Sequence, residues 1–219
     1  MKNLQKMGGL AALYMALAYL VNIVLFLFVL DYPNIVSADQ KVALLVENSM
    51  LIYATNLSAY VFFGVVLVIL TLALYDRLKK CAPVLMRLAA VIGFIWAGSL
   101  IASGMISNAA IDPITAMYAI NPAQAAVSWT VIETIALGMA GVGGELLGGL
   151  WMLLISWTAL QAREYPKGLN VLGIAIGVVG FISVLPGLND LGSLFGMLQL
   201  IWFIWVGIVM LRQKTTLAN

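Results

Sequence analysis

The residue in this sequence best placed to do chemistry is Glu145, an acidic side chain inside a long apolar stretch. It lies in Gly143-Gly-Glu-Leu-Leu-Gly-Gly149, about one helical turn inside the outer boundary of an expected membrane span. A charged group at the centre of a span costs about 2.5–3.5 kcal/mol, and less near the edge. Glu145 is therefore a candidate to bind a proton, a cation or a polar ligand. The alternative is a carboxylate that is hydrated at the interface or bonded to a neighbouring helix.

Three buried amides are expected at a similar depth to Glu145. Asn22, Asn56 and Gln199 each fall in the outer half of an apolar run. Together with Glu145 they predict a polar cavity that opens to the outside of the membrane. In the alternative interpretation they form hydrogen bonds between helices, which contribute about 0.6 kcal/mol each.

Two tryptophans, Trp151 and Trp202, lie well inside their expected spans, whereas tryptophan is typical of the membrane interface. A buried indole needs a partner for its N–H group, so these side chains either wall a pocket for an apolar or aromatic ligand or pack in the core. The predicted ligand-binding residues are therefore Glu145, Asn22, Asn56, Gln199, Trp151 and Trp202.

Enzyme signatures are absent from the sequence. It has no histidine and one cysteine, Cys81, which removes the usual metal ligands, the usual general base and any intramolecular disulfide. No Gly-x-Ser-x-Gly elbow, Walker loop or dinucleotide fingerprint occurs. We expect no enzymatic activity, no catalytic residues, no metal site and no cofactor.

The elements that must position these residues are membrane-spanning helices. Hydrophobic residues make up 63% of the 219 residues and charged residues 9%, far from the composition of a soluble domain. We predict an all-α, polytopic helical bundle that forms a single transmembrane domain over residues 1–219. The six predicted spans are 8–30, 50–75, 84–111, 143–160, 169–185 and 191–211.

The basic residues predict the orientation of these spans. With both termini in the cytoplasm, every lysine and arginine except Lys41 falls on the inner side, as the positive-inside rule requires. A seventh span over 123–138 would move the basic residues that follow it to the outer side. We therefore predict an outer-side helix over 122–138, where Glu133 faces water or the membrane surface.

Helix caps mark the connecting segments. Ser37-Ala-Asp-Gln40 resembles a capping box and predicts a short outer-side helix between the first two spans. Asp112-Pro113 and Asn121-Pro122 each resemble an N-cap followed by proline at the first helical position. Gly144-xxx-Gly148 and Gly173-xxx-Gly177 are small-residue patterns that favour close helix packing.

Three stretches carry a likeness to a known family. They are the glycine-led first span Met7-Gly-Gly-Leu-Ala-Ala-Leu13, the exit of the second span at Val65–Lys79, and Gly148-Gly-Leu-Trp-Met-Leu-Leu-Ile-Ser-Trp157 continuing through Pro166–Gly173. On these residues the chain resembles the bacterial membrane family catalogued as domain of unknown function 4386. The resemblance covers nearly the whole chain. It implies about six spans, no established activity and no catalytic residues to carry over.

The sequence therefore predicts a non-enzymatic protein of the bacterial inner (plasma) membrane. The leading hypothesis is that it binds or transports a small or lipid-like ligand through an outward-facing pocket. The alternative is a structural or accessory subunit that docks into a larger membrane complex through its small-residue helix faces. Membrane lipids are expected partners, a homo-oligomer or a larger complex stays open, and nucleic acid is not expected.

Overall fold

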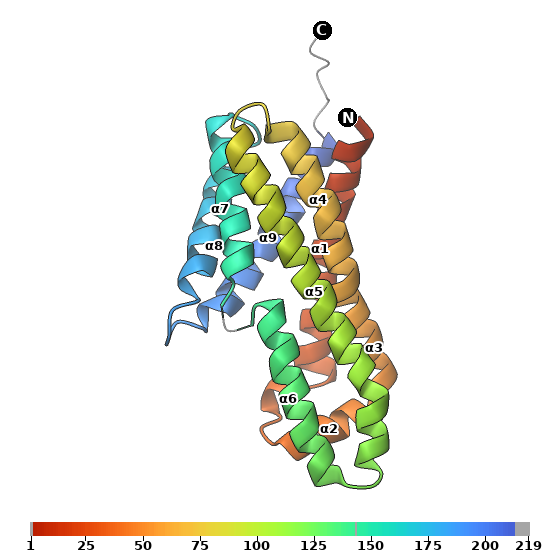
Figure 1. Cartoon of the computed structure of the whole chain (residues 1–219). Coiled ribbons are helices and arrows are strands. Elements are labelled where there is room, and N and C mark those ends of the chain that lie inside the picture. Colours follow the sequence, from red (N-terminus) through yellow and green to blue (C-terminus); the bar gives the residue numbers. More distant parts are fainter. Residues whose placement is uncertain (1, 143, 213–219) are drawn as a thin grey trace. The chain divides into compact units, whose positions relative to one another are not determined.

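A computed structural model of the chain describes residues 2–142 and 144–212, and these residues form helices joined by turns (Figure 1). Two segments, η1 and η3, are π-helical, and η2 is a short 3₁₀ helix. The elements are α1 (Lys2–Val24), η1 (Leu25–Val29), η2 (Tyr32–Asn34), α2 (Ala38–Glu47), α3 (Ser49–Asn56), η3 (Leu57–Phe62), α4 (Phe63–Leu78), α5 (Pro83–Tyr118), α6 (Pro122–Ala140), α7 (Leu146–Gln161), α8 (Lys167–Ile182) and α9 (Leu191–Arg212). The predicted all-α class is confirmed for these residues.

Several helices have the length and composition of membrane spans. A helix needs about 20 apolar residues to cross the hydrocarbon core. Five stretches in the described part of the chain qualify: Asn3–Val29, Ser49–Leu78, Pro83–Tyr118, Pro122–Ala140 and Leu191–Arg212. Helices α7 and α8 are apolar but have 16 residues each. The chain thus has the helices of a multi-pass membrane protein, while the six-span count and the orientation stay predictions.

One predicted boundary is wrong. The third span was expected to end at residue 111, with Asp112 as the cap of a new helix, but α5 continues through Pro113 to Tyr118. Ile111 and Ile114 on either side of the proline are buried at 4% and 1% exposure in an apolar core. Burial of this helix face outweighs the backbone hydrogen bond that proline cannot donate.

The helix over 122–138, predicted to lie on the outer side of the membrane, is present as α6 and is capped as expected. The Asn121 side-chain oxygen accepts a hydrogen bond from the Gln124 N–H at 3.2 Å. Because α6 is long and apolar enough to cross a membrane, its outer-side placement is not confirmed.

The described residues cluster into two compact units. Unit 1 consists of the described residues of Met1–Leu17, Gly64–Gly98 and Gly141–Asn219, and unit 2 consists of Ala18–Phe63 and Ser99–Ala140. The chain passes from one unit to the other within α1 and within α5. The single domain over 1–219 stays a prediction.

Unit 1 is built around glycines that allow helices to approach closely. A Cβ atom on Gly149 of α7 would lie 2.7 Å from the backbone nitrogen of Phe181 in α8. A Cβ atom on Gly177 of α8 would lie 2.8 Å from the backbone nitrogen of Leu153 in α7. The two helices lie side by side in Figure 1. Gly177 belongs to the predicted pattern Gly173-xxx-Gly177, so this pattern serves helix packing, and Gly149 does the same just after Gly144-xxx-Gly148.

Unit 2 has its own apolar core, in which α2 packs against α6. The hydroxyl of Ser37 accepts the N–H of Gln40 at 3.2 Å, so the predicted capping residue and the short helix that follows it are confirmed. This cap fixes where α2 begins and which side chains face α6. The core consists of Leu30, Val42, Leu45, Ile52, Ala110, Ile111, Ile114, Ala125, Ala126 and Trp129.

Candidate ligand-binding site

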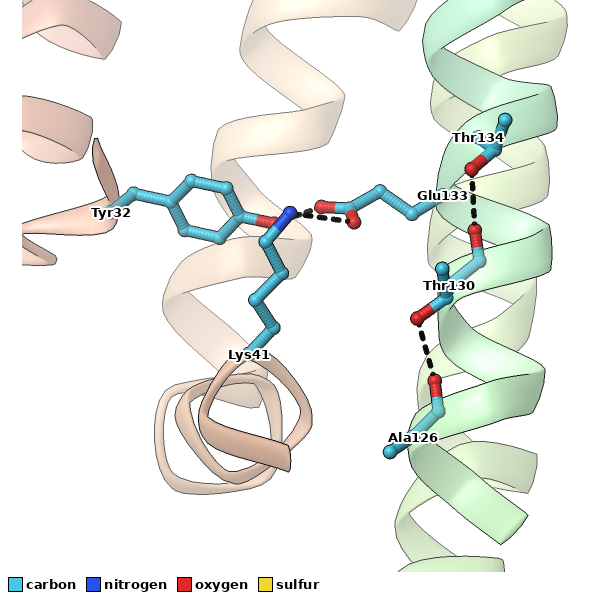
Figure 2. Close-up of polar contacts among 6 residues, drawn as sticks. All are labelled: Tyr32, Lys41, Ala126, Thr130, Glu133 and Thr134. Carbon is cyan, nitrogen blue, oxygen red and sulfur yellow. Dashed lines mark hydrogen bonds and ion pairs between the residues drawn. The ribbon is translucent and has the colours of Figure 1, made fainter. Parts of the chain in front are cut away.

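A charged cluster in unit 2 is centred on Glu133 of α6. The hydroxyl of Tyr32 donates to one carboxylate oxygen of Glu133, and the ammonium group of Lys41 lies 3.1 Å from the other. The same ammonium group lies 5.1 Å from the centre of the Tyr32 ring, which adds a cation–π contact. Figure 2 shows both side chains reaching toward the carboxylate. The side chains of Glu133 and Lys41 are 13% and 28% exposed, so the ion pair is largely shielded from solvent.

Each member of the cluster is held by its local structure. Tyr32 lies in the short turn η2, where its ring meets Phe26 edge to face at 5.5 Å between centroids. Lys41 lies in the first turn of α2, just after the Ser37 cap. Glu133 projects from a helix in which Thr130 donates its hydroxyl to the Ala126 carbonyl, and Thr134 makes the same contact with the Thr130 carbonyl (Figure 2). Tyr32 and Lys41, which are 101 and 92 residues from Glu133 in sequence, therefore meet at one carboxylate.

A cavity of about 100 Å³ lies beside this cluster, entirely within unit 2. Its walls are mostly apolar and aromatic, with polar groups at a few points, which is the usual character of a small-molecule site. The lining residues are Phe26, Leu30, Tyr32, Lys41, Leu45, Ile52, Asn56, Tyr60, Ser103, Ser107, Trp129, Glu133, Ala136 and Leu137.

The two π-helical segments both belong to unit 2 and both contribute to this cavity. Phe26 lies in η1 and Tyr60 lies in η3. A π-helical turn places one extra residue in a helix, so it redirects side chains, and such turns are frequent at functional sites. Here they bring two aromatic rings to the cavity wall.

Of the six residues predicted from sequence to bind ligand, Asn56 lines this cavity. Its side chain is 6% exposed and donates to the Asn108 side-chain oxygen at 2.9 Å. Asn22 belongs to the same unit but is not part of the lining; its amide nitrogen donates to the Ala18 carbonyl of its own helix at 2.7 Å. The side-chain oxygen of Asn22 is buried and has no hydrogen-bond partner among the described residues.

The other four predicted residues, Glu145, Gln199, Trp151 and Trp202, lie in unit 1. Glu145 does not sit inside a helix as expected but occupies the N-cap position of α7, because a turn at Gly141, with φ of +97°, delays the helix start to Leu146. Its backbone N–H donates to the Ser183 hydroxyl at 2.9 Å. The predicted set is thus divided between the two units.

The two predicted tryptophans belong to a packed aromatic cluster of unit 1. The ring of Trp151 lies 5.8 Å from Trp96 and 6.0 Å from Trp202, centre to centre. The Trp151 indole N–H donates to the Thr71 hydroxyl at 3.1 Å, and both side chains are fully buried. This arrangement corresponds to the core-packing alternative for the tryptophans.

Sequence reasoning missed the cluster of Tyr32, Lys41 and Glu133. One signal was available: Lys41 is the single basic residue on the predicted outer side, and Glu133 is the single charged residue of 122–138. Asp39 and Glu47 lie nearer to Lys41 in sequence, so this signal alone does not single out Glu133 as its partner. In the described part of the chain, no three acidic or cysteine side chains gather as a metal-binding group, and the partner of Glu133 is a lysine.

Comparison of the chain with protein-family models, with curated proteins and with solved structures finds no match. The structure itself defines the class: an all-helical protein whose apolar helices are those of a multi-pass membrane protein. The resemblance to domain of unknown function 4386 stays a prediction that rests on the residues quoted above.

Proposed function

We propose that the protein binds a small, uncharged, amphipathic ligand in the cavity of unit 2. The observation that carries this proposal is the meeting of Tyr32, Lys41 and Glu133 at the wall of an apolar, aromatic cavity. An ion pair that is largely shielded from solvent costs free energy to desolvate, and a hydrophobic pair often stabilises a fold as well. Its presence beside a cavity therefore favours a role in binding.

The charges of the site select the ligand class. Lys41 and Glu133 neutralise each other at 3.1 Å, so the cavity offers no net charge to an ionic ligand. A charged ligand would lose its hydration and gain no free counter-charge. An apolar ligand with one hydrogen-bonding group would contact the apolar walls and use the hydroxyl of Ser107, which lines the cavity.

The size of the cavity limits the ligand. A cavity of 150 Å³ lined by apolar side chains holds benzene. The cavity of unit 2 is about 100 Å³. It therefore suits a molecule of about four or five carbon atoms, or the end of a longer one.

The orientation predicted from the basic residues supports an outward-facing site, because it places Lys41 on the outer side of the membrane. Binding of the ligand from that side would be the first step of sensing or of transport.

The rival hypothesis is an accessory subunit that docks through small-residue helix faces. Gly149 and Gly177 lie against backbone atoms of the same unit, so these faces are already occupied within the chain. Purification in a mild detergent discriminates: a stoichiometric companion protein would support the rival and weaken the binding proposal.

Three probes of equal chain length test the ligand class: n-butanol, butyrate and n-butylamine. We expect n-butanol to raise the thermal unfolding midpoint of the purified protein, with no rise from the anionic or cationic analogue. A ligand at ten times its Kd stabilises the folded state by about 1.4 kcal/mol. Filling the cavity with Ser107→Phe should abolish the shift.

The control variant is Ala109→Phe, which adds the same ring at an exposed position of α5 outside the cavity lining. It should keep the response to n-butanol. A shift that survives in Ser107→Phe would place binding elsewhere, and a larger shift with butyrate or n-butylamine would overturn the charge argument. The absence of a shift with all three probes would contradict the proposal.

A further inference from the structure

A second hollow lies in unit 1, between the loop that joins α7 to α8 and the C-terminal turns of α9. It is an open groove of about 510 Å³, and its lining includes Arg163, Tyr165, Trp205, Ile208 and Arg212. It lies in the unit that does not contain the cavity proposed above, and no residue lines both.

The loop side of this groove is held in place by hydrogen bonds. The backbone N–H of Glu164 donates to the Ala159 carbonyl at 3.0 Å, and the Asn170 side chain donates to the Glu164 carbonyl at 2.8 Å. Asn170 is only 3% exposed, so this contact is shielded from water. Arg163 and Tyr165 have φ angles of +52° and +63°, a conformation that side chains other than glycine adopt only where the surroundings enforce it. The groove is therefore preorganised.

The charge of the groove is positive. The carboxylate of Glu164 also lines it, but that carboxylate is paired with the Arg77 guanidinium at 2.9 Å. Arg163 and Arg212 are exposed, and neither forms a salt bridge within residues 2–142 and 144–212. Two guanidinium groups are thus available to an anion.

The position of Arg212 sets the depth of the groove in a membrane. It is the last residue of the candidate span Leu191–Arg212, which has 22 residues and is therefore about 33 Å long. This length matches the hydrocarbon core, so the end of the helix lies at the level of the lipid headgroups. Arg163 lines the same groove and therefore lies at the same level.

Apolar and amphipathic side chains complete the groove. Trp205 is 37% exposed and Ile208 is 38% exposed, and both lie on α9 toward the hydrocarbon from Arg212. Tryptophan prefers the region where acyl chains meet headgroups. The groove thus presents cations at its polar end and apolar surface below them.

We propose that this groove binds the phosphate of an anionic phospholipid, with Arg163 and Arg212 contacting the phosphate oxygens and Trp205 and Ile208 contacting the start of an acyl chain. Guanidinium groups form paired hydrogen bonds with phosphate oxygens, which makes arginine well suited to this contact. A free soluble anion would use the arginines but would leave the apolar surface of α9 uncovered.

Tyr165 adds a hydrogen-bond donor to this site. Its hydroxyl oxygen accepts a hydrogen bond from the Gln5 side chain at 3.3 Å, which leaves the hydroxyl proton available. Burial raises the pKa of Tyr165 to about 12, so the phenol stays protonated at neutral pH. A neutral phenol in the groove lining does not reduce the positive charge of the groove.

Binding of single lipids to the full-length protein in detergent tests the proposal, with native mass spectrometry as the readout. Dioleoyl phosphatidylglycerol and dioleoyl phosphatidylcholine have the same acyl chains and differ in headgroup charge. The double variant Arg163→Gln/Arg212→Gln removes both cations of the groove. Because each basic residue near the surface contributes about fivefold to the attraction, we expect the loss of two to weaken phosphatidylglycerol binding by about 30-fold.

A charge-matched double variant, Lys80→Gln/Arg87→Gln, removes two exposed cations of unit 1 outside the groove. It should bind phosphatidylglycerol within about twofold of the unaltered protein, and neither variant should alter the weaker phosphatidylcholine binding. The unfolding midpoint without lipid reports whether the groove variant is folded.

Three outcomes would overturn the proposal. Equal losses in both double variants would indicate attraction to surface charge in general. Retained phosphatidylglycerol binding in the folded groove variant would place the lipid elsewhere. Displacement of phosphatidylglycerol by millimolar inorganic phosphate would indicate a site for a soluble anion. None of these outcomes bears on the cavity of unit 2, so the two proposals fail separately.

Discussion

The buried polar groups of this protein have different surroundings in its two units. In unit 1, the Trp151 indole and the Thr71 hydroxyl form a fully buried pair with no spare volume. A Cβ atom on the neighbouring Gly93 would lie 2.7 Å from the indole nitrogen and 2.8 Å from the hydroxyl. In unit 2, the ion pair of Lys41 and Glu133 lies at the wall of a cavity.

The difference arises from the kind of residue that separates the helices. Glycines in α7 and α8 let the two backbones touch, so no volume for a ligand remains between these two helices. Unit 2 instead places large side chains and two π-helical segments around its core, which leaves a cavity with a polar edge. Unit 1 is therefore closely packed where α7 meets α8, whereas unit 2 keeps a cavity in its core.

Substitution of Gly149 should produce the largest effect, because it tests this close packing directly. In Gly149→Ala, the added methyl group would meet the Phe181 nitrogen at 2.7 Å and the Gly180 carbonyl carbon at 2.9 Å. Backbone atoms cannot move aside as a side chain would, so α7 and α8 must separate. We expect a loss of about 2–3 kcal/mol of stability, measured as the free energy of unfolding in mixed micelles.

The matched control is Gly98→Ala in α5, where an added Cβ meets no described atom within 4 Å. Alanine favours helix over glycine by up to about 1 kcal/mol, so this variant should be neutral or slightly stabilising. If the two variants lost stability equally, the loss in Gly149→Ala would not come from close packing of α7 against α8.

A somewhat smaller effect is expected when the buried hydrogen bond of unit 1 is removed. Thr71→Val preserves the shape of the side chain but leaves the Trp151 N–H without its acceptor. A buried donor without a partner costs about 1–3 kcal/mol. The unfolding midpoint should fall, while the response to n-butanol should persist, since Thr71 belongs to unit 1.

Thr55→Val in unit 2 provides the comparison for this variant. The Thr55 hydroxyl donates only to the Leu51 carbonyl of its own helix, at 2.7 Å, and the side chain is 3% exposed. Its removal leaves no orphaned donor, and we expect a change below about 0.5 kcal/mol. A Thr55→Val effect as large as that of Thr71→Val would show that any buried threonine contributes equally.

Much of the fold could be predicted from the sequence because membrane helices and caps depend on local chemistry. Apolar composition predicts helices where a lipid environment demands internal hydrogen bonds. The capping residue Ser37 sets the start of α2 through a contact with Gln40 three residues away. Asp112-Pro113 carried an equally clear local signal and was misread, because the burial of Ile111 and Ile114 depends on helices distant in sequence.

The candidate site could be predicted only in part, and the reason is that depth in a membrane does not reveal which way a side chain faces. Depth grouped Asn56 with Gln199 and Glu145, yet Asn56 lies in unit 2 and the other two residues lie in unit 1. Glu145 was predicted as a binding residue because it is an acidic residue within an apolar stretch of the sequence. The pairing of Glu133 with Lys41 joins α6 to α2, and no spacing in the sequence encodes that contact.

The smallest expected effect, and the one that tests unit 2 itself, is the coupling between Lys41 and Glu133. The variants Lys41→Gln and Glu133→Gln each leave the other charge unpaired, and the double variant removes both charges. Because the pair is partly exposed, we expect a coupling energy of about 1 kcal/mol from the unfolding free energies of the four proteins. The double variant should be more stable than either single variant, because no uncompensated charge remains beside the apolar cavity.

The same cycle distinguishes a structural ion pair from one that serves binding. If the pair only stabilises the fold, the double variant should respond to n-butanol as the unaltered protein does. If the pair orients the Tyr32 hydroxyl at the cavity wall, the response should weaken even where stability is restored, because the neutral amide that replaces the Glu133 carboxylate accepts the Tyr32 hydrogen bond more weakly than the carboxylate does. A coupling energy of zero together with an unchanged n-butanol response would show that the charged cluster takes no part in ligand binding. Only the apolar cavity of unit 2 would then remain as a candidate site.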